Sequence, residues 1–156
     1  MQVRDLVVSV LIAALYSAMV IVFHPISFHV IQVRIANALI GVVPILGKPA
    51  IIGITLGVLI GNITSPLGVL DILSFIPTFV GLTIIYKLRN VSVLLGLLIY
   101  SLILGAWVSF LLWYILGLPY VISFIYVTIG IMIATSGLGY MVYMVLSKYF
   151  KVISYG

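Results

Sequence analysis

The chain has 156 residues, of which 65% are hydrophobic and only 6% are charged, and its net charge is +5. Because a soluble domain carries about 25% charged residues, this composition excludes a soluble globular domain and a disordered chain, and predicts an integral membrane protein with the lipid bilayer as its main solvent. The sequence contains no cysteine, which excludes disulfides, thiolate catalysis and cysteine metal sites.

Six apolar segments follow one another along the chain, and together they predict an all-α fold. A membrane-spanning helix needs about 20 residues, which the first, fourth, fifth and sixth segments provide. The second and third, of 13 and 14 residues, are either short buried helices or one broken pair. None shows the strict polar–apolar alternation of a membrane β-barrel. We therefore expect residues 1–156 to form one polytopic membrane domain with six transmembrane helices, over residues 6–23, 35–47, 50–63, 69–87, 91–116 and 121–147.

The basic residues predict how the chain lies in the membrane. Six crossings put both termini on one side, and the opposite side carries a single basic residue, Arg34. Because cytoplasmic loops are enriched in Lys and Arg, both termini are expected in the cytoplasm of a multi-pass plasma-membrane protein. If the second and third segments do not cross separately, the charges still favour a cytoplasmic N-terminus. The basic residues on the terminal side are Arg4, Lys48, Lys87, Arg89, Lys148 and Lys151.

The scattered basic residues and the length of the first apolar run each predict that a feature is absent. The basic residues are single and scattered between apolar runs, so no nucleic-acid partner is indicated. The first apolar run is long enough to span the membrane, so we expect no removable signal peptide.

Small residues recur four apart on two predicted helices. Gly53, Gly57 and Gly61 form one glycine face, on which a neighbouring backbone can approach closely. We expect that face to pack within the protein's own bundle. Ala14 and Ala18 form a second face on the first helix, which either packs internally or meets another subunit.

Polar residues gather near one predicted membrane face, beside the two short segments. Short or interrupted hydrophobic segments indicate the binding site of a transporter. An aspartate in the membrane costs about 2.5–3.5 kcal/mol, so Asp71 needs a partner, and Arg34 is the candidate. A purely structural Arg34–Asp71 pair and a ligand-binding role are both open. The gathered residues are His24, Ser27, His29, Gln32, Arg34, Asn37, Asn62, Thr64, Ser65 and Asp71.

Several of these residues also have simpler roles. His24 and His29 flank Pro25 in a predicted loop, and without a third ligand at a suitable spacing they favour solvation over metal binding. Asn62 follows Gly61 and can simply cap a helix. Asn37 either caps a helix or contacts a ligand.

The chemistry of the polar set limits what it can bind. A guanidinium, amide groups, one carboxylate and the ring of Phe28 suit a small planar heterocycle with donors and acceptors along its edge. No resident metal or cofactor is expected.

Three motifs resemble a known family of transport proteins. Residues 25–39 (PISFHVIQVRIANAL), 57–62 (GVLIGN) and 65–71 (SPLGVLD) are similar, in order and spacing, to the QueT-type queuosine-precursor transporters. These are substrate-binding S components of energy-coupling factor (ECF) transporters. The motif likeness covers about residues 8–90, and the length and six-helix layout extend it to the whole chain.

The resemblance implies a substrate, partners and site residues. The substrate is a 7-deazaguanine precursor of queuosine or archaeosine, and the partners are a transmembrane coupling protein and two ATPase subunits. It implies that Ala14 and Ala18 contact the coupling protein. Gln32, Arg34, Asn62 and Asp71 fall in the motif positions. The family usually has Glu where this chain has Asn37, so the ligand is either a neutral deazaguanine or a different molecule.

These observations favour a transporter subunit over an enzyme. The chain has no phosphate-binding loop, no H-E-x-x-H motif and only two acidic residues. Two alternatives stay open, a stand-alone proton-coupled secondary transporter and a structural membrane subunit without ligand. In the leading hypothesis Arg34 and Asn37 bind substrate acceptors and Asp71 binds donors. The remaining candidates, which orient or stack on the substrate, are Gln32, Asn62, His29 and Phe28.

Overall fold

The computed structural model describes residues 2–24 and 34–154 and shows helices over nearly all of them. No strand occurs within these two ranges. Four helical stretches are long and apolar enough to cross a membrane: Val3–Val22, Val69–Leu88, Val93–Leu116 and Tyr120–Tyr149. Two shorter apolar stretches are Ile35–Leu46 and Lys48–Thr64. The division into four long and two short apolar segments is thus the one that the sequence predicts.

Several of the expected segments are built from more than one kind of helix. The second segment is mostly 3₁₀-helix, the fourth is interrupted near its start, and the sixth contains a π-helical stretch. In chain order the elements are α1 (Val3–Val22), η1 (Ile35–Val42), α3 (Val43–Leu46), α4 (Lys48–Gly61), η2 (Asn62–Thr64), α5 (Val69–Ile72), α6 (Phe75–Leu88), α7 (Val93–Leu116), α8 (Tyr120–Met132), η3 (Ile133–Gly139) and α9 (Tyr140–Ser154).

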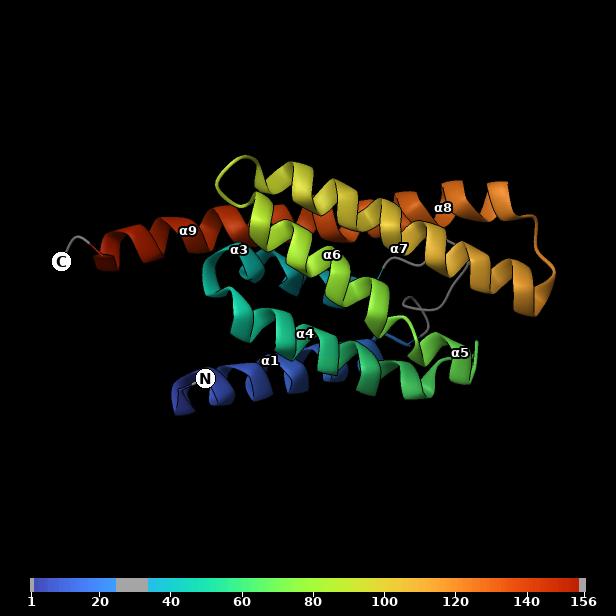
Figure 1. Cartoon of the computed structure of the whole chain (residues 1–156), viewed down its shortest axis with the longest axis horizontal. Helices are drawn as coiled ribbons and strands as arrows, with labels where there is room; N and C mark the ends of the chain where they lie inside the picture. The colour runs from blue at the N-terminus through green and yellow to red at the C-terminus, as the bar shows by residue number, and fades with distance from the viewer. Residues whose placement is uncertain (1, 25–33, 155–156) are drawn as a thin grey trace.

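Both termini lie at the same end of an elongated bundle (Figure 1). The α3–α4 and α6–α7 turns lie at that end too, whereas α5 and the α7–α8 turn lie at the opposite end. Gly47 makes the α3–α4 turn with φ of 65°, in the left-handed region that glycine adopts without strain. One residue therefore reverses the chain between the two short segments.

The glycine face of α4 packs against α1. A Cβ added at Gly57 would lie 2.8 Å from the Cβ of Tyr16, and one at Gly53 would lie 2.6 Å from the carbonyl oxygen of Ser9. Neither distance leaves room for a side chain, so the two backbones approach each other because these positions are glycine. The internal packing that the sequence predicts for this face is confirmed.

Two irregular helices, η1 and η3, pack on each other through glycine. A Cβ at Gly41 would overlap the carbonyl oxygen of Gly139. The 3₁₀-helix is wound more tightly than an α-helix and the π-helix more loosely, and both recur at functional places in proteins. This contact matters for the site because η1 begins directly after Arg34 and contains Asn37.

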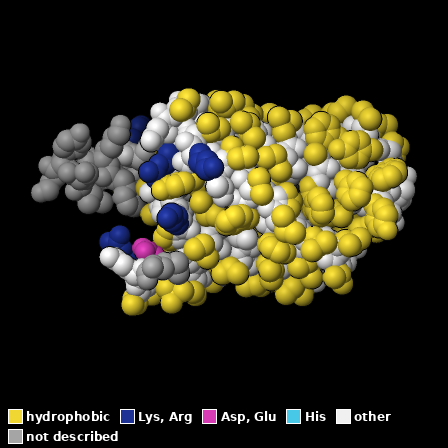
Figure 2. Space-filling model, in the orientation of Figure 1, with side chains coloured by type: hydrophobic (Ala, Val, Ile, Leu, Met, Phe, Trp, Pro, Cys, Tyr) yellow, Lys and Arg dark blue, Asp and Glu magenta, His cyan; other side chains and the backbone are white. Residues whose placement is uncertain are grey.

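The surface of the molecule is apolar over most of its length and basic at one end. Figure 2 shows hydrophobic side chains over most of the visible face, with Lys and Arg gathered at the end that carries the termini. The basic side chains Arg4, Lys48, Lys87, Arg89 and Lys148 are all exposed. An apolar body of this kind is what a lipid environment requires.

Candidate functional site

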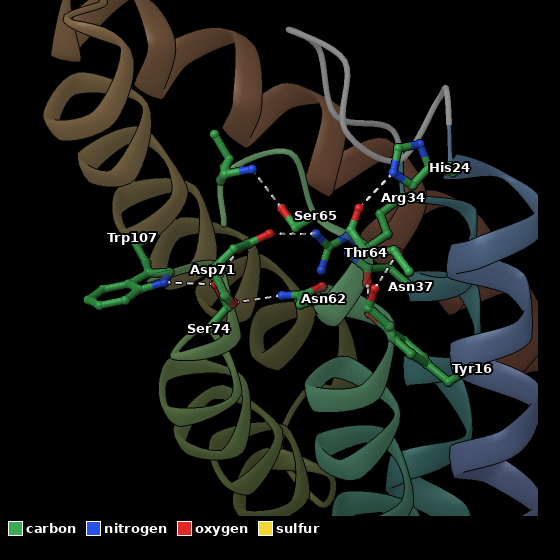
Figure 3. A network of polar contacts seen from close by, with 12 residues as sticks. Tyr16, His24, Arg34, Asn37, Asn62, Thr64, Ser65, Asp71, Ser74 and Trp107 are labelled. Atoms are coloured by element: carbon green, nitrogen blue, oxygen red, sulfur yellow. Dashed lines mark hydrogen bonds and ion pairs between the residues drawn. The ribbon is translucent and has the colours of Figure 1, made fainter. Parts of the chain in front are cut away.

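The centre of the site is a buried ion pair between Arg34, just before η1, and Asp71 in α5. Nη2 of Arg34 lies 4.0 Å from Oδ2 of Asp71, and the two side chains are 10% and 1% exposed (Figure 3). The pairing that the sequence suggests is therefore present. At this separation the charges attract each other, but the distance is too long for a hydrogen bond between these two atoms.

A chain of hydrogen bonds fixes the Asp71 carboxylate. Ser74 Oγ donates to Oδ1 of Asp71 at 2.7 Å, and Nε1 of Trp107 donates to Ser74 Oγ at 2.9 Å. Nδ2 of Asn62 donates to the backbone carbonyl of Asp71 at 2.9 Å. Side chains from α7 and η2 thus hold the short helix α5 in place.

Asn37 is fixed from the other side by α1. The hydroxyl of Tyr16 donates to Oδ1 of Asn37 at 2.6 Å. Both residues are buried, with 0% and 3% exposure. Because this bond uses the carbonyl oxygen of the amide, the amino group is the part of Asn37 that can donate elsewhere.

Two buried acceptor atoms, one of them the Asp71 oxygen of the ion pair, have no hydrogen-bond donor within the described residues. They are Oδ2 of Asp71 and Oδ1 of Asn62. Buried polar atoms are normally satisfied, and leaving one unsatisfied costs about 1–3 kcal/mol. The cluster therefore presents acceptors that a bound molecule with N–H groups can satisfy.

A small cavity lies on the other side of Arg34, towards α7 and α8. Its volume is about 10 Å³, which is room for about one water molecule. This cavity is lined by Arg34, Asn37, Tyr100, Leu104, Val108 and Ile131. A cavity between residues 24–34 and the turn over residues 62–71, where we expect the ligand to enter, involves residues 25–33, which lie outside the described residues. The wall opposite Arg34 and Asn37 is mostly aliphatic, because α7 and α8 contribute Leu104, Val108 and Ile131 to it beside the ring of Tyr100.

The outer rim of the cluster joins α1 to the turn after α4. A ring nitrogen of His24 lies 2.9 Å from the carbonyl oxygen of Thr64, and Ser65 Oγ accepts from the backbone N–H of Leu67 at 3.2 Å. His24 thus has a structural contact. The described residues contain no group of three or more His, Cys, Asp or Glu side chains that could hold a metal ion.

Three of the candidate residues, Phe28, His29 and Gln32, lie outside the described residues. The structure brings the other four, Arg34, Asn37, Asn62 and Asp71, into one network (Figure 3).

Sequence reasoning missed three members of this network. Ser74 lies three residues after Asp71 and so falls on the same helical face, a spacing that could have indicated it. Tyr16 and Trp107 carry no such signal, because an aromatic residue in an apolar helix is equally typical of the core.

The alanine face of α1 points away from this site and from α4. Ala14 and Ala18 are exposed, as are their neighbours Leu11 and Leu15. Ser9, Ala13 and Tyr16, on the opposite side of the helix, are buried. The described residues therefore leave the alanine face open to lipid or to another chain.

Comparison with known proteins identifies a family for this chain. The family model described as QueT transporter matches residues 6–148, nearly the whole chain. No curated protein and no solved structure matches.

Proposed function

The chain belongs to the QueT transporter family and is a multi-pass membrane transport protein, and from this premise we propose that it is the substrate-binding subunit of an ATP-driven ECF-type importer. Its proposed substrate is a small planar heterocycle, a 7-deazaguanine precursor of queuosine or archaeosine. The observation that carries the proposal is the buried Arg34–Asp71 pair with two acceptors that no described residue satisfies, Oδ2 of Asp71 and Oδ1 of Asn62.

The polar inventory of the cluster suits such a substrate. A deazaguanine has N–H and amino donors along one edge, which Asp71 and Asn62 can accept, and a carbonyl oxygen, to which Arg34 and Asn37 can donate. The apolar wall of α7 and α8 supplies a surface for the flat ring. Phe28, His29 and Gln32 complete the proposed site as stacking and orienting groups.

Asn37 bears on the charge of the substrate. Its carbonyl oxygen already accepts a hydrogen bond from Tyr16, so its amino group is the donor left for a ligand. A carboxylate at this position would favour a cationic ligand, whereas an amide supplies no charge. We therefore propose a neutral deazaguanine, such as the cyano form, over the aminomethyl form.

Substrate entry requires the cluster to open. The cavity beside Arg34 holds about 10 Å³, whereas sites for small organic molecules have volumes of about 300–1,000 Å³. Binding therefore separates η1 from α7 and α8. We expect the movement to centre on the contact between η1 and η3, because both helices are irregularly wound.

The proposed orientation puts six crossings in the plasma membrane and both termini in the cytoplasm. Its support is the basic end of the molecule, which carries exposed Lys and Arg side chains beside both termini (Figure 2). An excess of Lys and Arg marks the cytoplasmic side.

The open alanine face is the proposed contact with the rest of the transporter. We propose that Ala14 and Ala18 meet a transmembrane coupling protein, which joins this chain to two ATPase subunits. Small exposed residues let a partner helix approach closely in lipid, where apolar burial alone provides no driving force.

Calorimetry on the purified chain tests the substrate. Cyano-deazaguanine is expected to bind, and Arg34→Ala and Asp71→Asn each to weaken binding about 30-fold or more, because truncating one partner of a buried charged pair costs about 2–5 kcal/mol. Arg4→Ala and Asp5→Asn are matched controls, since they make the same changes at the N-terminal end of α1. Unchanged binding in both site variants would remove the site assignment.

Liposome uptake separates the proposal from its alternatives. We expect no uptake by this chain alone, and uptake with ATP when the coupling protein and ATPases are present. Uptake by the chain alone under a proton gradient would instead identify a secondary transporter. No ligand in calorimetry, with constant co-purification of a larger complex, would identify a structural subunit.

A further inference from the structure

A second, larger cavity lies at the opposite end of the molecule from the polar cluster. It has a volume of about 400 Å³ and runs between α4 and α6. The two helices run side by side, and the start of α4 and the last turn of α6 lie at the end of the bundle that carries the termini (Figure 1). Its volume falls in the range of about 300–1,000 Å³ that is typical of small-molecule sites. The lining residues are Lys48, Ile51, Ile52, Phe79, Thr83, Tyr86 and Lys87.

The floor and sides of this groove are apolar along most of their length. Ile51 and Ile52 line it from α4, and Phe79, which is 49% exposed, lines it from α6. Thr83 adds little polarity, because its hydroxyl donates to the backbone carbonyl of Phe79 at 2.8 Å. The groove therefore suits a hydrocarbon chain.

One end of the groove is positively charged. Lys48 and Lys87 line it and are both exposed. No acidic residue lines it, and the two acidic residues of the chain, Asp5 and Asp71, lie elsewhere. The groove therefore combines positive charge at one end with an apolar surface along the rest of its length.

The ring of Tyr86 forms a fixed wall at the charged end. It packs against the α3–α4 turn, where a Cβ at Gly47 would lie 2.9 Å from its Cε2. The guanidinium of Arg89 lies over the same ring, with Cζ 4.2 Å from the ring centroid. A cation–π contact of this kind places a third positive charge beside the two lysines.

We propose that this groove binds an anionic phospholipid of the leaflet next to the termini. The phosphate lies between Lys48 and Lys87, and one acyl chain lies along Ile52 and Phe79. Basic pockets between transmembrane helices bind anionic headgroups in this way. A zwitterionic lipid has the same acyl chains but no net charge to match the lysines, so the groove selects anionic lipid.

Native mass spectrometry of the purified full chain tests the proposal, with phosphatidylglycerol and phosphatidylcholine of identical acyl chains as probes. We expect retained phosphatidylglycerol, and about 25-fold weaker retention in Lys48→Gln/Lys87→Gln, since each lysine near an anionic surface contributes about fivefold. Arg4→Gln/Lys148→Gln is the matched control, because it removes two exposed charges at the same end but outside the groove. It is expected to retain phosphatidylglycerol.

Two further arms separate the lipid from other ligands. Glycerol 3-phosphate carries the phosphate without acyl chains and is expected not to displace phosphatidylglycerol. Ile52→Trp fills the groove without changing its charge and is expected to lose the lipid; unfolding temperature confirms that the variant is folded. Equal retention in both double variants, equal binding of phosphatidylcholine, or displacement by glycerol 3-phosphate would each overturn the proposal. None of these readouts depends on the deazaguanine site.

Discussion

The two ends of this bundle hold their charged residues in opposite ways. At the end with the termini, Arg4, Lys87 and Lys148 are exposed. Towards the other end, Arg34 and Asp71 are buried and paired. Exposed lysines and arginines remain in water or among lipid headgroups at little cost, whereas a buried pair needs good geometry and further hydrogen bonds to offset desolvation.

This difference separates charges that orient a membrane protein from charges that can act on a substrate. The basic end has no hydrogen-bond network comparable to the one around Asp71 among the described residues. The paired end uses Tyr16, Asn62, Ser74 and Trp107 to hold its polar groups. This network supports the proposed site, because a buried pair that served stability alone could often be replaced by apolar residues without loss.

The largest effect on stability is expected when one member of the Arg34–Asp71 pair is removed. Arg34→Met or Asp71→Leu is expected to lower the free energy of unfolding by about 3–5 kcal/mol, because each leaves an uncompensated buried charge. Detergent-based equilibrium unfolding measures the loss. The double variant Arg34→Met/Asp71→Leu is expected to lose less than either single variant. Additive losses would mean that the two charges do not interact.

A smaller loss of stability is expected when a hydrogen bond next to the pair, the one between Tyr16 and Asn37, is removed. Tyr16→Phe keeps the ring but removes the donor to Oδ1 of Asn37, leaving a buried acceptor unsatisfied at a cost of about 1–3 kcal/mol. The same unfolding measurement checks it. Tyr114→Phe is the matched control, because Tyr114 is 66% exposed and its loss of a hydroxyl is expected to have little effect. Equal losses in the two variants would contradict a specific role for Tyr16.

The smallest effect is expected at the basic end. Arg4→Gln and Lys148→Gln each remove one exposed charge and are expected to change the free energy of unfolding by less than about 0.5 kcal/mol. Deazaguanine affinity in calorimetry is expected to stay the same. A loss comparable with that of Arg34→Met would mean that the exposed charges contribute as much to stability as the buried pair does, which contradicts the comparison.

The helical layout could be predicted well from the sequence because hydrophobic length alone decides it. The four long segments and the two short ones follow from apolar runs, and the Arg34–Asp71 pair follows from the scarcity of charges. A membrane aspartate in a chain with few charges has few possible partners.

The remaining features of the site depend on packing that a single sequence does not specify. Tyr16 and Trp107 contact polar groups 21 and 33 residues away, and nothing local distinguishes them from core aromatics. The spacing of Ala14 and Ala18 resembles that of Gly57 and Gly61, yet among the described residues the glycines meet a neighbouring helix and the alanines are exposed. Likewise, the sequence predicts a helix over residues 35–47 but not the 3₁₀ winding of Ile35–Val42, the part that contacts η3.

The Arg34–Asp71 pair has an electrical consequence. Its two charges sum to zero, so any displacement of this region along the membrane normal moves no net charge through the transmembrane potential. If the bound guest is neutral, a movement of the pair and the guest together is therefore independent of voltage. A singly protonated guest adds about 2.3 kcal/mol for each 100 mV that it crosses, and its uptake becomes sensitive to the polarisation of the cell.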